Sequence, residues 1–334
     1  MRLYKYLSPE RLDVLRYERI RFSQPNVFND PFELSTTVGS IFGEGVNPLE
    51  QAAAATDFGS QLLGMVGKVA SKGLQETVAR QFGVLTLTER PDNLLMWAHY
   101  AKNHEGFVLE VDTTHAFFDR PKADGGRTHC VGKVAYSQTR PAVALTGYKG
   151  VEALFVKSTE WEYEQEWRMV LPLSESIQTI ETQWPPIHLF ALPPAALSGV
   201  ILGCRMTAAP RGEILSMLAN EERYAHVAVR QANLEDRTFA LRLTESPFFH
   251  HQKALKAISE CRFDDALAHA ERAIEVAPDL DKGRHYGVRA LVRLKMKNQQ
   301  GFIDDMSTVK RLSPDVYANL LKDAGYKAPP EQSK

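Results

Sequence analysis

The chain has 334 residues, which is enough for about two domains of ~150 residues each. Hydrophobic residues make up 44% and charged residues 24%, a composition typical of globular proteins that excludes extensive disorder. The 40 lysine and arginine residues nearly balance the 41 acidic residues. The net charge of -1 therefore gives no electrostatic support to a non-specific nucleic-acid or membrane binder.

The cysteines and the N-terminus indicate the compartment. Cys130, Cys204 and Cys261 lie far apart in the sequence and lack the paired spacing of a zinc site, so we expect no bound metal. The first six residues lack the apolar segment of a signal peptide. No stretch approaches the ~18 consecutive apolar residues of a membrane span. We therefore expect a cytoplasmic protein that has no membrane partner.

Residues 1–246 predict an α+β domain with a mixed sheet and a helical insert. The first strands are expected at 3–6 and 20–23, separated by a helix that begins at Ser8 and Pro9. No GxGxxG or Walker motif is present, and the regular strand-helix alternation of a dinucleotide-binding fold is missing. Hydrophobic spacing predicts the remaining elements of this domain, namely helices within 47–82 and at 209–219, and strands at 84–87, 106–111, 133–136, 166–171, 200–203, 226–230 and 239–243.

Residues 247–326 predict a small all-α appendage. Leu255–Ile258 align with Leu291–Leu294 at an offset of 36 residues, and apolar residues recur at helical spacing in both segments. The segment 263–274 resembles the second helix of a tetratricopeptide repeat, a family with a period of ~34 residues. The resemblance implies pairs of antiparallel helices that stack on one another.

The end of the appendage predicts a capping helix. Ser313 and Pro314 are typical of a helix start, and the helix is expected to run to about Ala324. Two repeats and a cap are fewer than the ~3 repeats that a self-standing solenoid needs. We therefore expect the segment 250–324 either to bind a protein or peptide partner or to dock on the rest of the chain.

Two segments near the N-terminus contain candidate binding residues. Lys5 and Tyr6 lie on the first predicted strand, and a lysine there either binds a phosphate or is solvated at the edge of a sheet. Asn29 and Asp30 precede a proline, so their side chains are expected to cap a turn. Such a turn either forms the rim of a pocket, with Asp30 or Glu33 presenting oxygens, or has a structural role alone.

The segment around residue 100 is rich in aromatic side chains. Trp97, His99 and Tyr100 can form a flat wall on which a base or a nicotinamide ring stacks. If the segment is helical, Trp97 and Tyr100 can instead belong to the core and His99 can form a structural hydrogen bond. His99 and His104 are five residues apart, which does not place them on one helical face, so we reject a metal site there.

The segment 163–171 predicts a strand with a charged face. Alternation places Glu164, Glu166 and Arg168 on one face and the aromatic and apolar residues on the other. On an exposed sheet this row is an ion-pair ladder worth ~0–1 kcal/mol. Facing a cleft, it orients a carboxylate that can stabilise a developing positive charge. The working hypothesis is that the charged face points into a cleft.

Four motifs, and the order in which they occur, resemble those of a known family. They are Lys5-Tyr6, FNDPFE at 28–33, MWAHYA…H.G at 96–106 and W.YE.EWR at 161–168. Together they are similar to a large bacterial family catalogued as domain of unknown function 2971, over about residues 1–243. This family resemblance implies no settled activity.

A second resemblance concerns the layout of the chain. A strand with a cationic residue, an aromatic element and a glutamate on a late strand are similar to ADP-ribosyltransferase-like toxins. The resemblance implies that Lys5 contacts the phosphate or ribose of NAD and that Tyr100 or Trp97 stacks on the nicotinamide. It implies that Glu166 is the catalytic glutamate, with Arg168 keeping it ionised and oriented. Those enzymes more often have histidine or arginine at the position of Lys5.

We therefore expect an NAD-consuming, ADP-ribosyltransferase-like effector, such as a toxin or a phage-defence protein, with NAD as substrate. Two alternatives remain open. One is a non-catalytic sensor of a nucleotide or metabolite that signals through the helical repeats, and the other is a Mg²⁺-dependent nuclease that uses Asp30, Glu33 and Glu164. The expected catalytic residues are Glu166, Arg168 and Glu164, and the expected binding residues are Lys5, Tyr6, Trp97, His99, Tyr100, Asn29 and Asp30.

Overall fold

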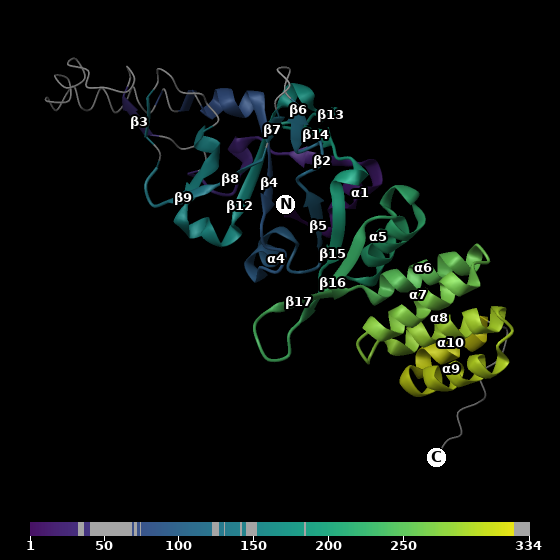
Figure 1. Ribbon diagram of the computed structural model, residues 1–334. Helices are drawn as coiled ribbons and strands as arrows, with labels where there is room; N and C mark the ends of the chain where they lie inside the picture. The colour runs from purple at the N-terminus through teal and green to yellow at the C-terminus, as the bar shows by residue number, and fades with distance from the viewer. Residues whose placement is uncertain are drawn as a thin grey trace. The chain divides into compact units, whose positions relative to one another are not determined.

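The computed structural model describes residues 1–32, 37–40, 69, 72–73, 75–121, 127–129, 131–140, 142–144, 152–183 and 185–323. The chain divides into two compact units. The first comprises residues 1–100 and 108–197, and the second comprises residues 101–107 and the described chain from Ser198 onward. Mixed strands with helices, followed by a helical region, confirm the α+β prediction (Figure 1).

The first unit is built on strands in the order β5-β1-β4-β12-β8. β4 pairs in antiparallel fashion with both β1 and β12, and β12 pairs in the same way with β8. Alternating apolar residues place one face of these strands in the core, where Leu85 and Met169 are buried. The bounds of these strands are Arg2–Leu7 for β1, Phe82–Thr88 for β4, Phe107–Asp112 for β5, Val131–Lys133 for β8 and Glu166–Pro172 for β12.

Short elements surround this sheet. The helix predicted near Ser8 is a 3₁₀-helix followed by one α-helical segment, and Ser8 makes no side-chain cap hydrogen bond. Residues 75–81 are helical, while the rest of the predicted insert lies mostly outside the described residues. The helical elements are η1 (Pro9–Leu12), α1 (Asp13–Tyr17), η2 (Pro25–Val27), α4 (Leu94–Tyr100), η3 (Glu152–Phe155), η4 (Thr159–Glu164), η5 (Leu173–Glu175) and η6 (Pro194–Ala196).

Four small sheets are formed by the described residues of the first unit. In the three-stranded sheet β14 pairs with both β13 and β2, and Phe22 and Phe190 stack at its buried face. The strands are β2 (Arg19–Phe22), β13 (Gln178–Ile180) and β14 (Ile187–Ala191), and the two-stranded pairs are β3 (Thr37–Ser40) with β10 (Ala142–Ala144), β6 (Asp119–Pro121) with β7 (Arg127–His129), and β9 (Ala135–Ser137) with β11 (Val156–Ser158).

The second unit begins with a three-stranded segment of sheet and a helix. β15 (Leu197–Leu202) pairs in parallel with β16 (Ala228–Leu234), and β16 pairs in antiparallel fashion with β17 (Leu241–Glu245). The parallel pair requires a crossover, which contains α5 (Ala208–Asn220) and the short η7 (Glu222–Tyr224). These elements lie close to the predicted ranges.

Between residues 247 and 323, the described chain of the second unit forms five helices. α7 packs against both α6 and α8, and α9 packs against α8. Alanines at the contacts, such as Ala254 and Ala270, are buried and allow the helices to approach closely. Leu255 and Leu291, which the 36-residue offset aligns, are each 37% exposed, whereas Leu294 is more exposed than its aligned partner Ile258. The helices are α6 (Pro247–Ser259), α7 (Phe263–Val276), α8 (Lys282–Lys295), α9 (Gln299–Leu312) and α10 (Pro314–Asp323).

Two further observations bear on the organisation of the chain. The boundary expected after residue 246 coincides with the start of α6, and it lies inside the second unit. Within the described ranges, no helix combines the length and the apolar character that crossing a bilayer requires.

Candidate functional site

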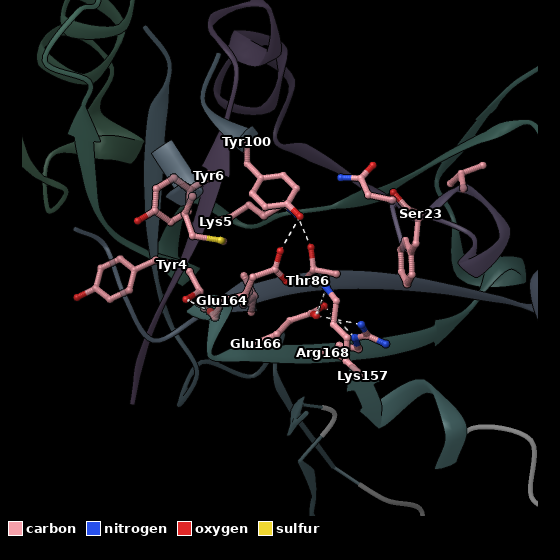
Figure 2. A pocket seen from close by; sticks show the side chains of 16 residues that line it. Tyr4, Lys5, Tyr6, Ser23, Thr86, Tyr100, Lys157, Glu164, Glu166 and Arg168 are labelled. Atoms are coloured by element: carbon pink, nitrogen blue, oxygen red, sulfur yellow. Dashed lines mark hydrogen bonds and ion pairs between the residues drawn. The ribbon is translucent and has the colours of Figure 1, made fainter. Parts of the chain in front are cut away.

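A cavity of about 260 Å³ lies within the first unit. Its walls come from β1, β4, β12, α4, the C-terminal end of η4 and the loop that follows η2 (Figure 2). The cavity brings together most of the residues that the sequence singled out. These are Lys5, Tyr6, Asn29, Tyr100, Glu164, Glu166 and Arg168.

Glu164 and Glu166 both face the cavity although they belong to different elements. Glu164 ends the 3₁₀-helix η4, and Glu166 begins β12. Between them Gln165 adopts a left-handed backbone conformation with φ 44°, which turns the chain from helix to strand. The predicted strand therefore begins at residue 166 rather than at 163. The turn, and not strand alternation, brings the two carboxylates to one side.

Two cations neutralise this buried acidic pair. The Nε and Nη2 atoms of Arg168 lie 2.8 and 2.9 Å from the two carboxylate oxygens of Glu166. The Nζ atom of Lys157 lies 2.6 Å from Oε2 of Glu164 and 3.0 Å from Oε2 of Glu166. Both glutamates are only 3% exposed and Arg168 is fully buried. Such a network is stable only because every charge has a hydrogen-bonded partner.

The ion pairs determine the ionisation of Glu166. Burial alone would raise the pKa of the Glu166 carboxyl, because the charged form loses hydration. Arg168 and, to a smaller extent, Lys157 outweigh that effect and lower the pKa below its ordinary value. Glu166 is therefore an anion at neutral pH.

Lys5 is a cation of the cavity for which the described part of the chain provides no carboxylate partner. Its Nζ atom donates a hydrogen bond to Oγ1 of Thr86 on β4, at 2.8 Å. Among the described residues it forms no ion pair. Burial lowers the pKa of Lys5 to about 8; the charge of Glu166 opposes this shift, and the nearby Arg11 and Arg21 reinforce it.

Tyr100 links the aromatic helix α4 to the acidic pair. Its hydroxyl donates a hydrogen bond to Oε1 of Glu164 at 2.6 Å (Figure 2). Burial, and then the charge of Glu164, raises the pKa of Tyr100 above its ordinary value, so the hydroxyl stays protonated at neutral pH. Tyr6 also lines the cavity, but its hydroxyl is engaged with the carbonyl oxygen of Arg90 at 2.8 Å.

Three of the predicted residues do not line the cavity. Trp97 is fully buried against Tyr6, with ring centroids 5.3 Å apart, and its Nε1 donates to the carbonyl oxygen of Pro91. His99 is exposed to solvent. Asp30 accepts the amide N–H of Phe32 at 2.8 Å, so its carboxylate caps a turn. The positions of Trp97 and Asp30 fit the structural interpretation of their motifs, whereas the exposed His99 fits neither the stacking wall nor the structural hydrogen bond.

Sequence reasoning assigned no role to two residues that organise the site. Lys157 is the middle residue of the short strand β11, and only the fold brings it between the two glutamates. Thr86 points from β4 toward Lys5. The one signal available for Lys157 is its proximity in sequence to four glutamates, which is equally typical of an exposed surface.

The described residues provide no evident metal centre. They contain no group of three or more histidine, cysteine, aspartate or glutamate side chains placed to hold an ion. Of the residues named for the nuclease alternative, Asp30 caps its own turn and Glu164 is paired with Lys157. Glu33 lies outside the described residues.

Comparison with known proteins adds one finding. The model of a family described as "Protein of unknown function (DUF2971)" matches residues 96–169. No curated protein and no solved structure matches the chain. The matched range contains Tyr100, Lys157, Glu166 and Arg168, all of which line the cavity. The match supports the resemblance to this family over residues 96–169, which contain two of the four motifs.

Proposed function

We propose that this chain is an NAD-consuming enzyme similar to ADP-ribosyltransferases, acting as an effector such as a toxin or a defence protein. The observation that carries the proposal is the convergence of Lys5, Tyr100, Glu166 and Arg168 on one cavity. These residues come from three separate elements, β1, α4 and β12. An ion-pair ladder along one exposed strand would not bring Lys5 of β1 and Tyr100 of α4 to the same cavity.

The chemistry suits a buried carboxylate. Cleavage of the bond between ribose and nicotinamide lets nicotinamide leave with the bonding electrons, and positive charge develops on the ribose. In the proposed arrangement the ionised Glu166 stabilises that charge, Tyr100 offers a flat ring to the nicotinamide, and Lys5 contacts a phosphate or the ribose. A preorganised charge of this kind contributes about 10²–10³ in rate.

Nicotinamide release tests the proposal directly. The purified chain is incubated with NAD, and free nicotinamide is measured by chromatography. We expect Glu166→Gln to lower the rate by about 10²–10³, because the amide keeps the shape and removes the charge. Glu175→Gln is the control, since Glu175 forms a surface ion pair with Arg120.

Loss of folding must be separated from loss of charge in this experiment. Glu166→Gln weakens a buried ion pair, so rates are measured well below the unfolding midpoint of each variant, which circular dichroism gives. An undiminished rate in folded Glu166→Gln would remove Glu166 from the mechanism. Absence of any nicotinamide release by the natural chain would remove the enzymatic proposal itself.

One observation favours a sensor instead. Both oxygens of Glu166 already accept hydrogen bonds from Arg168 or Lys157, and Glu164 is engaged by Lys157 and Tyr100. Carboxylates neutralised in this way can shape a binding pocket without turnover. A sensor predicts that NAD or ADP-ribose raises the unfolding temperature while no nicotinamide appears. At a ligand concentration of 100 Kd the expected stabilisation is about 2.7 kcal/mol.

A further inference from the structure

We infer that Lys5 is a reactive amine and that the cavity captures a small anionic carbonyl compound by forming an imine with it. This inference goes beyond the proposed function, because it requires neither NAD nor cleavage of a glycosidic bond. Its ligand class is an aldehyde or ketone that carries one carboxylate or phosphate group.

The geometry gives Lys5 what a nucleophilic amine needs. Lys5 lines the cavity and is half-buried as a residue, so the cavity gives a small ligand a route to its side chain. Its one hydrogen bond in the described structure goes to a neutral hydroxyl, that of Thr86, at 2.8 Å. A hydroxyl orients the amine without favouring its protonated form as a carboxylate would.

Two other lysines near the site, Lys157 and Lys133, differ in this respect. Lys157 lines the same cavity but lies between two carboxylates, at 2.6 and 3.0 Å. Lys133 on β8 is largely exposed and pairs with Glu89 at 2.8 Å. Carboxylate partners favour the charged ammonium, which has no lone pair for attack. Lys5 thus combines access with the absence of an ion-pair partner among the described residues.

Burial and charge support the same conclusion. Burial lowers the pKa of Lys5 to about 8, so a substantial fraction of the amine is neutral near pH 7.5. An amine with an ordinary lysine pKa near ~10.4 is almost entirely protonated at that pH. The neutral fraction at Lys5 is therefore larger by about a hundredfold. Desolvated lysines of this kind are known nucleophiles toward carbonyl groups.

The proposed step balances without any further reactant. The Nζ lone pair attacks the carbonyl carbon, and the carbonyl oxygen takes up protons and leaves as water. The amine loses both of its protons in forming the C=N bond, so one molecule of water is the only other product. Tyr100, whose hydroxyl is held by Glu164 at 2.6 Å, provides a proton donor and acceptor pair inside the same cavity.

The charge of the cavity selects among carbonyl compounds. Its lining contains three cationic side chains, those of Lys5, Lys157 and Arg168, against the two carboxylates of the acidic pair. While Lys5 is protonated, the lining carries one net positive charge that attracts an anionic group. Once Lys5 is neutral or converted to an imine, the charges of the lining balance. A volume of about 260 Å³ admits a small compound such as a keto or aldehyde acid.

Reductive trapping tests this inference. The full chain is incubated with glyoxylate and cyanoborohydride at pH 7.5, and tryptic peptides are mapped by mass spectrometry. Modification of Lys5 blocks cleavage after it and yields one peptide spanning residues 3–11, whereas modification of the N-terminal amine remains on the peptide of residues 1–2. We expect Lys5 to be modified about a hundredfold faster than Lys133.

Two variants serve as controls in the same tryptic peptide analysis. Lys5→Met abolishes the modified peptide of residues 3–11, and Lys133→Met leaves it unchanged. The rate at Lys5 is expected to rise with pH to a plateau with a midpoint near 8. Acetaldehyde, which carries no charge, is expected to label Lys5 more slowly than glyoxylate. Labelling of Lys5 no faster than Lys133, or a midpoint near ~10 as in an ordinary lysine, would overturn the inference.

The same experiment keeps this inference apart from the proposed function. If NAD occupies the cavity, millimolar NAD slows the trapping of Lys5. Fast trapping that NAD does not slow would leave the reactive amine in place and count against NAD as the ligand. Because the measurement on the natural chain is decisive alone, the result does not depend on whether the Lys5→Met variant folds.

Discussion

At the scale of single residues, Lys5 carries a charge that the fold destabilises. Its pKa falls from 10.5 to about 8, chiefly because burial penalises the ammonium form. Between pH 8 and 10.5 the unfolded chain therefore binds more protons than the folded chain, and stability rises with pH across this window. Below pH 8 the cost is fully present. A residue kept at such a cost is typical of a functional site.

This cost predicts that Lys5→Met stabilises the protein. We expect a higher unfolding temperature than that of the natural chain at pH 7, because methionine fills a similar volume and carries no charge. The gain should shrink as pH rises from 8 toward 10.5. Thermal unfolding followed by circular dichroism at several pH values measures it. Lys133→Met is the exposed control, expected to change stability by less than about 0.5 kcal/mol. A pH-independent loss of stability in Lys5→Met would contradict the prediction.

The sequence predicted several individual site residues but not how their charges are satisfied. Lys5, Tyr100, Glu166 and Arg168 were identified from their motifs, and all four line the cavity. Lys157 was not assigned a role, because an ion pair between β11 and the start of β12 depends on tertiary contacts that no local pattern encodes.

At the scale of elements, Gly203 lies so close to the loop at residues 104–106 that position 203 has no room for a side chain. Gly203 follows β15, and its N–H donates to the carbonyl oxygen of Gly106 at 2.9 Å. A Cβ at this position would lie 2.1 Å from the carbonyl oxygen of His104 and 2.7 Å from that of Gly106. These are backbone atoms, so the clash cannot be relieved by a rotamer change.

Gly203→Ala and Gly212→Ala therefore form a matched pair with opposite predictions. Gly203→Ala should lower the free energy of unfolding by about 3 kcal/mol through overpacking. Gly212 lies inside α5 with open space around it, and Gly212→Ala should stabilise the protein by about 0.5–1 kcal/mol through helix propensity. Denaturant unfolding measures both. Equal effects of the two variants would show that the close approach at Gly203 is absent.

Secondary structure was more predictable than side-chain direction. Apolar alternation predicted the strands around residues 84–87 and 166–171, because one face of each is buried. Alternation also predicted that the second strand starts at residue 163, which is wrong. The left-handed backbone of Gln165 separates the 3₁₀-helix from the strand, and such a conformation at a non-glycine residue has no strong sequence signal. Alternation also could not tell that Trp97 packs on Tyr6 while Tyr100 reaches the cavity.

At the scale of the whole molecule, the site and the helical region belong to different compact units. Every residue that lines the cavity lies in the first unit, while α6 to α10 belong to the second. The pair of helices α8 and α9 is held together by Asp305, which is 2% exposed. Its carboxylate lies 2.7 Å from Nη2 of Arg289 and 3.0 Å from Nη1 of Arg293.

Removing this carboxylate tests whether the two units are energetically separate. We expect Asp305→Ala to lower the stability of the helical region by about 3 kcal/mol, because two arginines on α8 lose a buried partner. Asp304→Ala is the control. Asp304 is exposed and its side chain accepts a hydrogen bond from Gln300, so the effect should be below about 0.5 kcal/mol. Hydrogen exchange resolved by peptide measures the loss in α8 and α9.

Because the cavity is built from the first unit alone, reductive trapping of Lys5 should proceed at the same rate in Asp305→Ala as in the natural chain. A parallel loss of exchange protection in β4 and β12 would show instead that the two units unfold as one.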